Sequence, residues 1–186
     1  GCSIGAAMMG KNAQTANDLI KHADVALYEV KKRGRHGVAC FNDALGLIYE
    51  RRMTLSAQLA QAIEADQIDV DLQPQFSLEK KRVHGFEALV RWYHPELGKL
   101  GPHEFLEIAE QNGLMPVIDR IAAQKAFAAL ADLKQAGHED LRISINVSTA
   151  SLNGEYFVAS LCNLAEEHGI APDEITVEVL ETNLLD

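Results

Sequence analysis

The stretch that decides the fold is Gly85–Gly98, GFEALVRWYHPELG. It holds an acid, Glu87, and a base, Arg91, inside an otherwise apolar run that ends at Trp92. Burying a charged side chain is costly unless the charge is paired or binds a metal ion. Because residues two apart in a strand face the same way, Glu87, Leu89 and Arg91 share one face of a predicted strand. The pattern therefore indicates either an ion pair or a functional site on that face.

Strands and helices alternate on both sides of this stretch. The predicted strands occupy 68–76, 81–92, 141–147 and 175–180, and the predicted helices lie near 102–112, 116–136 and 155–168. Such alternation is typical of parallel βα units. Four strands with their helices are about half of a (β/α)8 barrel, which typically needs about 250 residues. We therefore expect an α/β fold, an incomplete (β/α)8 TIM-type barrel.

Charge divides the chain into two parts. Residues 1–42 have a net charge of +3, whereas the whole chain has −10, so residues 43–186 carry −13. We expect a small α+β module over 1–42, a linker helix over 43–66 and the barrel segment over 67–186. An acidic chain is a poor non-specific binder of nucleic acid, so no DNA partner is expected.

Cysteine usage and hydropathy bear on the compartment. Cys2, Cys40 and Cys162 are widely spaced and form no CxxC motif, which fits reduced thiols and disfavours zinc. No apolar run reaches the roughly 18 residues of a membrane span. We expect a cytoplasmic location, either for a separate protein or for the cytoplasmic part of a larger, membrane-attached one.

Polar side chains also mark the next two predicted strands. Asn146 lies in RISINVS and Glu178 in ITVEVLE, each near the carboxyl end of its strand, where barrels hold their active sites. Together with Glu87 they offer only oxygen ligands, a set that suits Mg²⁺ or Mn²⁺. Arg91 suits a phosphate. A single asparagine after a strand is more often a helix cap, but recurrence on three successive strands favours a functional site.

Several motifs in a fixed order carry a family resemblance. Residues 52–186 resemble the first part of an EAL domain, the bacterial cyclic-di-GMP phosphodiesterase module, through Gln73-Pro74, GFEALVRWYHPELG with its ExLxR core, PHEFLEIAEQNGL, INVS and EVLE. Residues 1–42 resemble the C-terminal tail of a GGDEF domain, the diguanylate cyclase module, without its signature loop. The matching residues there are Ser3-Ile4-Gly5, Ala23-Asp24, Tyr28, Lys32 and Gly34-Arg35.

The EAL resemblance implies a barrel that hydrolyses cyclic-di-GMP to pGpG at a two-metal site. Glu87, Asn146 and Glu178 would be metal ligands, which gives Glu87 a catalytic role. Glu181, the second glutamate of EVLE, would support an active-site loop and so contribute to catalysis. Two divalent ions can activate a water and stabilise the attacking and leaving oxygens of a phosphodiester.

The resemblance also implies the substrate contacts, which would be Gln73, Leu89 and Arg91. Gln75 stands where the family usually has an apolar residue after Gln-Pro. This departure from the family pattern is a small one.

The family pattern continues after the last residue with an Asp-Asp pair, a lysine and a further glutamate. We therefore expect an incomplete metal site and a chain that is inactive by itself; metal-dependent release of pGpG by this chain would contradict that expectation. Two alternatives stay open. One is a non-catalytic cyclic-di-GMP receptor, and the other is an interaction module that forms a homodimer through the EAL segment or the linker helix.

Overall fold

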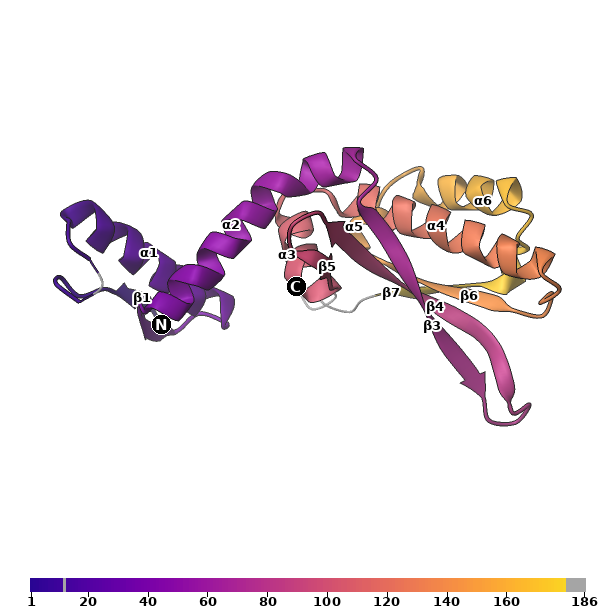
Figure 1. Ribbon diagram of the computed structural model, residues 1–186, viewed down its shortest axis with the longest axis horizontal. Helices are drawn as coiled ribbons and strands as arrows, with labels where there is room; N and C mark the ends of the chain where they lie inside the picture. The colour runs from indigo at the N-terminus through magenta and orange to yellow at the C-terminus, as the bar shows by residue number, and fades with distance from the viewer. Residues whose placement is uncertain (12, 180–186) are drawn as a thin grey trace. The chain divides into compact units, whose positions relative to one another are not determined.

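The computed structural model describes residues 1–11 and 13–179 of the chain (Figure 1). The chain forms two compact units, Gly1–Ala57 and Gln58–Asp186. The division falls inside helix α2 (Asp43–Glu64), which the sequence predicts over 43–66. None of the helices in the described part of the chain combines the length and apolar composition of a membrane span.

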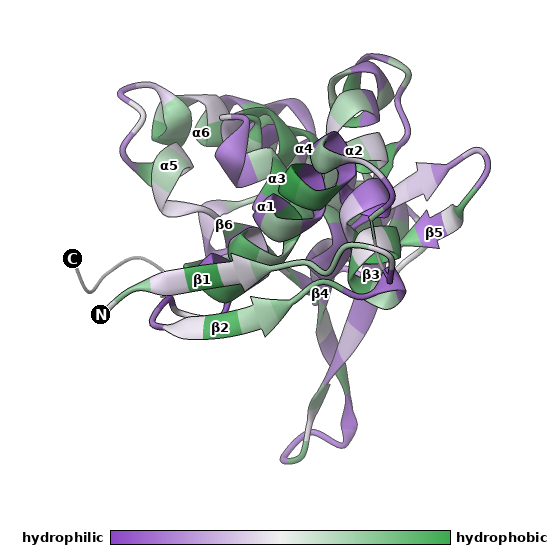
Figure 2. Cartoon of the chain, turned by 90° about the vertical axis from the view of Figure 1, so that its left-hand side faces the viewer, coloured by the Kyte–Doolittle hydropathy of each residue, from purple (hydrophilic) through white to green (hydrophobic). Residues whose placement is uncertain are grey.

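The first unit pairs two short strands against one helix. Strands β1 (Ser3–Ala6) and β2 (Gly37–Cys40) lie side by side in parallel, joined through α1 (Ala16–Lys32) (Figure 2). Helix α1 begins with a capping box, in which the Asp18 N–H donates to the Thr15 hydroxyl and the Thr15 N–H donates to the Asp18 carboxylate. The core of this first unit is small, and its buried cluster comprises Val25, Ala26 and Phe41.

The second unit is built on one five-stranded sheet, in which four strands follow the order β3-β4-β6-β7 and a short fifth strand, described below, pairs with β4. The four strands are β3 (Ile68–Ser77), β4 (Arg82–His94), β6 (Arg142–Val147) and β7 (Ile175–Val179). As predicted, β4, β6 and β7 run parallel to one another. The prediction was wrong for β3, which pairs with β4 in the antiparallel sense. The connection over 78–81 is too short for the crossover that a parallel pair needs, so the two strands form a hairpin.

The helices follow the predicted order with two additions. They are α3 (Pro102–Gln111), α4 (Met115–Gln135), α5 (Thr149–Leu152), α6 (Phe157–Glu167) and the 3-10 turn η1 (Pro172–Glu174). The two additions are the short helix α5 and the turn η1. The three-residue strand β5 (Gly98–Leu100) was not predicted either. Strand β5 folds back on β4 because His94 accepts the backbone N–H groups of Glu96 and Leu97 in the intervening turn.

The sheet of the second unit has two chemically different faces. Helices α4 and α6 cover one face (Figure 1), and the buried side chains there are apolar. The core cluster includes Ala88, Ala123, Ala126, Phe127, Leu130, Ile143, Ile145, Val147, Leu164, Ala165 and Ile170. The intervening strand positions, among them Glu87, Ser144 and Asn146, therefore point to the opposite face. Within the described residues the sheet is open, so the fold is the predicted incomplete (β/α)8 barrel.

An ion pair joins helix α4 to the turn η1, at the end of the sheet opposite the carboxyl ends of the parallel strands. Lys134 Nζ lies 2.5 Å from Glu174 Oε1, and both side chains are mostly buried. Burial raises the pKa of Glu174, but the Lys134 hydrogen bond and charge and the Ala171 N–H outweigh it, so the pKa lies below its ordinary value. The pair therefore stabilises the fold fully above the ordinary carboxyl pKa of about 4.3, and this stabilisation is lost as the pH falls through the lowered value.

Replacing Glu174 by glutamine is expected to lower the free energy of unfolding by about 1.5–3 kcal/mol at pH 7, the usual contribution of a hydrogen bond to a charged group. The difference from the unmodified chain should shrink below about pH 4. Urea unfolding followed by the fluorescence of the single tryptophan, Trp92, measures this in the second unit. Asp173→Asn, next to it and more exposed, is the matched control. An equal loss at pH 3 and pH 7 would contradict the assignment.

Candidate active site

Three predicted metal ligands lie next to one another on the polar face of the sheet. Asn146 Nδ2 donates a hydrogen bond of 2.8 Å to Glu87 Oε1, which joins β6 to β4. Asn146 also stands directly opposite Glu178 in the parallel register of β6 and β7. The three side chains are partly buried, so they are neither in bulk water nor sealed in the core. The face therefore brings two carboxylates and one amide together from three strands.

The position of Glu87 within its strand differs from the prediction. Asn146 and Glu178 lie one residue before the carboxyl ends of β6 and β7, as expected. Glu87 lies near the middle of β4, because β4 continues to His94. The extra length arises from pairing with β3 up to Trp92 and with β5 beyond it, whereas the pairing of β4 with β6 stops at Ala88. Glu87 is thus close to the end of the parallel part of its strand.

The donor set fits a hard divalent cation. Because the Asn146 amide nitrogen is held by Glu87, the amide oxygen is left for another partner. Carboxylate and amide oxygens are the ligands that Mg²⁺ and Mn²⁺ prefer. Within residues 1–11 and 13–179 no group of three or more His, Cys, Asp or Glu side chains is placed to hold a metal ion, and the row described above contains only two carboxylates. Glu181 lies outside the described residues.

Gln73, a predicted substrate contact, lies on the same face as Glu87 and opposite it in the antiparallel register of β3 and β4. Two residues on, the Gln75 amide nitrogen reaches across β4 to the Ser144 hydroxyl at 3.2 Å. Gly85, which has no side chain, stands opposite Gln75 in the register of β3 and β4. Gln75 therefore has a bridging role in the sheet, which the sequence comparison with the family did not predict.

A cavity of about 270 Å³ opens beside Glu87 and Asn146. Leu89, the second predicted substrate contact, is part of its wall. The other lining residues are mostly apolar and come from β4, α3, α4 and the end of β6: Ala88, Val90, Pro102, Leu106, Met115, Ile118, Asp119, Ala122, Val147 and Ser148. An apolar cavity with a few polar groups at one side is the usual form of a small-molecule site.

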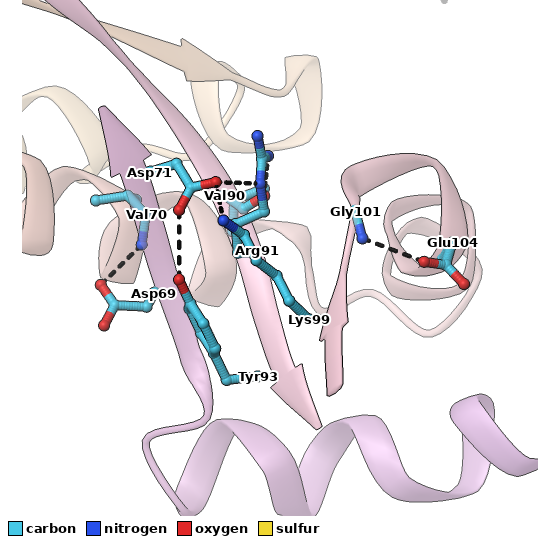
Figure 3. A network of polar contacts seen from close by, with 9 residues as sticks. All are labelled: Asp69, Val70, Asp71, Val90, Arg91, Tyr93, Lys99, Gly101 and Glu104. Carbon is cyan, nitrogen blue, oxygen red and sulfur yellow. Dashed lines mark hydrogen bonds and ion pairs between the residues drawn. The ribbon is translucent and has the colours of Figure 1, made fainter. Parts of the chain in front are cut away.

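Arg91, the third predicted substrate contact, is held by an acid on the neighbouring strand. Its Nε donates to Asp71 Oδ2 at 2.8 Å, and its Nη1 donates to the Val90 carbonyl (Figure 3). Lys99 Nζ lies 2.5 Å from the same Asp71 oxygen, and the Tyr93 hydroxyl donates to the other oxygen at 3.3 Å. The Lys99 hydrogen bond and the Arg91 interaction hold the pKa of Asp71 below its ordinary value. Asp71 is therefore ionised at neutral pH.

A buried carboxylate that the sequence analysis did not single out supports the end of β6. Asp119, on α4, accepts hydrogen bonds from the Ser148 backbone N–H, the Ser148 hydroxyl and the Ser151 hydroxyl, at 2.6–2.9 Å. It fixes the turn that follows Asn146 and lines the cavity. The signal was present in the sequence, because Asp119 interrupts the apolar stripe of Met115, Ala122 and Ala126 on α4.

Family models match most of the chain. The EAL domain model matches residues 56–186, and the model of the diguanylate cyclase GGDEF domain matches residues 1–37. These ranges agree with the resemblance that the motifs indicate.

Among similar proteins, the biofilm architecture maintenance protein MbaA of Vibrio cholerae is 36% identical over 180 residues, 97% of this chain. The cyclic di-GMP phosphodiesterase NbdA of Pseudomonas aeruginosa is 32% identical over 183 residues, 98% of this chain. The chain spans 23% of the length of each of these two relatives.

A solved structure of the PaMucR phosphodiesterase in complex with c-di-GMP superposes with a TM-score of 0.65 at 31% sequence identity. The match covers 69% of this chain and 52% of that one. The family model, the relatives and the fold agree with one another, and the chain belongs to the EAL domain family.

Proposed function

We propose that this chain contributes the first part of a cyclic-di-GMP phosphodiesterase site to a GGDEF–EAL signalling protein. The observation that carries the proposal is the hydrogen bond between Asn146 and Glu87, with Glu178 in register beside them. It brings together oxygen donors of the kind that a metal-dependent phosphodiesterase uses as ligands. The relative NbdA is a cyclic di-GMP phosphodiesterase, and the similar structure of PaMucR is a complex with c-di-GMP; both support the same substrate for this chain.

In this proposal Glu87, Asn146 and Glu178 hold Mg²⁺ or Mn²⁺ at one side of a two-metal site. When bound, the ions would supply an activated water and neutralise charge on the phosphates. The chain itself holds the Asn146 amide nitrogen through Glu87, which would leave the amide oxygen available to an ion. Glu181, which follows Glu178 by three residues, would support the loop beside the site.

The substrate is assigned to the cavity and the strands next to it. Leu89 and the apolar wall of the 270 Å³ cavity would take one guanine base. Gln73, opposite Glu87, would bind a polar group of the dinucleotide, and Arg91 would bind a phosphate through its remaining N–H groups. A chain with a net charge of −10 depends on such local cations and on metal ions to accept a dianion.

Isothermal titration calorimetry of the chain with cyclic-di-GMP tests the proposal. Heat of binding is expected in the presence of Mg²⁺ or Ca²⁺ and should be greatly reduced with EDTA, because removal of the metal leaves two carboxylates facing the phosphates. Chromatography of the same samples for pGpG separates a hydrolase from a receptor that binds without cleaving. Absence of heat at high micromolar ligand with either metal would overturn the proposal.

Partners and location follow from the same proposal. A cyclic-di-GMP signalling module acts in the cytoplasm. A homodimer through α2 is supported by large apolar side chains that are more than 40% exposed along its first half, namely Leu47, Ile48 and Met53. Light scattering at several concentrations should then give twice the chain mass of 20.4 kDa, and Ile48→Glu should return the chain to a monomer. A single-chain mass for the unmodified protein at all concentrations would contradict the dimer.

A further inference from the structure

The polar face carries a second cluster of charges beyond the row of predicted metal ligands. We call Asp71, Arg91, Tyr93 and Lys99 the Asp71 cluster (Figure 3). Its members come from three strands that follow one another along the chain and lie side by side, since β3 and β5 both pair with β4. Tyr93 stands directly opposite Lys99 in the register of β4 and β5. Asp71 is the carboxylate at which the cluster converges.

The contacts of Asp71 fix the orientation of the Arg91 guanidinium. Asp71 Oδ2 takes the Arg91 Nε–H at 2.8 Å, and the Val90 carbonyl takes a second N–H from Nη1 at 2.8 Å. Among the described residues Nη2 makes no hydrogen bond. A guanidinium held at its Nε edge keeps its remaining N–H donors in one direction, and a group fixed before binding loses less entropy when the ligand arrives.

Asp71 is itself held in place, which an orienting group must be. Lys99 Nζ lies 2.5 Å from Oδ2, and the Tyr93 hydroxyl donates to Oδ1 at 3.3 Å. Lys99 also lies 5.8 Å from the centre of the Tyr93 ring, within the range of a cation–π contact. Each of the two carboxylate oxygens of Asp71 therefore has a partner.

The net charge of the Asp71 cluster is positive although the cluster contains an acid. A carboxylate beside an arginine would neutralise it and repel a phosphate, but Asp71 is shared between two cations, so Asp71, Arg91 and Lys99 together carry a net charge of +1. Asp69, the next acid along β3, is turned away from this cluster in Figure 3 and accepts the N–H of Val70. The cluster thus remains favourable to an anion.

We propose that Asp71 is a positioning residue for Arg91, with Lys99 offsetting its charge, and that this arrangement sets the affinity of the site for the ligand phosphate. The inference rests on the proposed function, in which Arg91 contacts cyclic-di-GMP. It assigns a role to two residues, Asp71 and Lys99, that lie outside the ExLxR motif. It also predicts that removing the charge of Asp71 weakens the binding of the phosphate ligand, whereas charge repulsion alone predicts tighter binding.

The test is Asp71→Asn, which keeps the shape of the side chain and removes its charge. Simple electrostatics expects tighter binding of a dianion when an acid is removed. If Asp71 instead positions Arg91, the affinity for cyclic-di-GMP should fall by about tenfold, as is usual when a partner that orients a ligand-binding group is lost. Calorimetry with cyclic-di-GMP and Ca²⁺ on the whole chain decides the sign, and Asp71→Glu should recover part of the affinity. Equal or tighter binding by Asp71→Asn would overturn the inference.

A double-mutant cycle and a matched control complete the design. In an Arg91→Met background, Asp71→Asn should no longer weaken binding, because Asp71 acts only through Arg91. A further tenfold loss in that background would overturn the inference. Asp140→Asn makes the same charge change at an exposed ion pair with Arg82 and should leave the affinity unchanged within about twofold. If Asp140→Asn loses as much affinity as Asp71→Asn, the loss is not specific to the Asp71 cluster and the inference fails.

A measurement without ligand separates this inference from the proposed function. In a ¹⁵N correlation spectrum of the free chain, the Arg91 Nε–H signal should shift on Asp71→Asn and exchange faster with water. No heat from the unmodified chain would refute the proposed function alone. An Arg91 Nε–H signal that is unchanged in Asp71→Asn would refute the positioning role, whatever the outcome of the titration.

Discussion

Replacing Glu87 by glutamine is expected to weaken the metal-dependent binding of cyclic-di-GMP at least about 100-fold. Loss of an outer-shell partner typically lowers metal affinity by about 10- to 100-fold, so loss of a charged ligand should reach the upper end or exceed it. Glutamine keeps an oxygen for the Asn146 amide, whose hydrogen bond to Glu87 Oε1 is 2.8 Å, so the sheet should be preserved. Calorimetry with cyclic-di-GMP at fixed Mg²⁺ or Ca²⁺ measures the change.

The control for this substitution is Asp140→Asn, which removes one negative charge from an exposed side chain paired with Arg82. Circular dichroism and the unfolding midpoint should be the same for both variants and the unmodified chain. An affinity for Glu87→Gln within threefold of the unmodified chain would exclude Glu87 as a metal ligand. An equal loss in Asp140→Asn would mean that overall charge, and not ligation, governs binding.

Replacing Phe127 by alanine is expected to lower the free energy of unfolding of the second unit by about 3–5 kcal/mol. The Phe127 side chain is fully buried on α4, within the core cluster that covers the apolar face of the sheet. The loss combines the transfer of an aromatic ring with the cavity it leaves behind. Because Trp92 is the only tryptophan and lies in β4, its fluorescence in urea follows the second unit specifically.

Phe127→Leu is the matched control for this prediction. It keeps most of the apolar volume and should lose far less stability than Phe127→Ala. The core cluster that contains Phe127 lies on the opposite face of the sheet from Glu87. The folded Phe127→Leu variant should therefore bind cyclic-di-GMP as the unmodified chain does. A loss below 1 kcal/mol for Phe127→Ala would mean that α4 is not packed on the sheet as described.

The face-sharing of strand residues could be predicted from the sequence, because it depends only on the two-residue period of a strand. Glu87, Leu89 and Arg91 were placed on one face of their strand in this way. The hydrogen bond between Asn146 and Glu87 depends in addition on the register of β4 and β6, which the period does not give. The parallel order of β4, β6 and β7 followed from the helical patterns between them. The antiparallel pairing of β3 could have been inferred too, because only 78–81 separates it from β4.

Other features depend on contacts that a period cannot reveal. The ion pair of Arg91 with Asp71 requires the register of β3 on β4, which no local pattern fixes. Strand β5, which carries Lys99, is only three residues long and shows no alternation. Asp119 was detectable as an acid in an apolar helix face, but its partners Ser148 and Ser151 lie about thirty residues further along the chain.

The division of the sheet into a helix-covered face and a polar face has a consequence for how such a module changes over evolutionary time. Substitutions at alternate positions of β6 act on different properties: Ile143, Ile145 and Val147 affect stability, whereas Asn146 affects ligand chemistry. Ligand chemistry can therefore diverge while the scaffold persists. Insertion or deletion of a single residue within β6 removes that independence, because every side chain beyond it changes face. Length variation should accordingly concentrate in the loops, with the strands kept free of gaps.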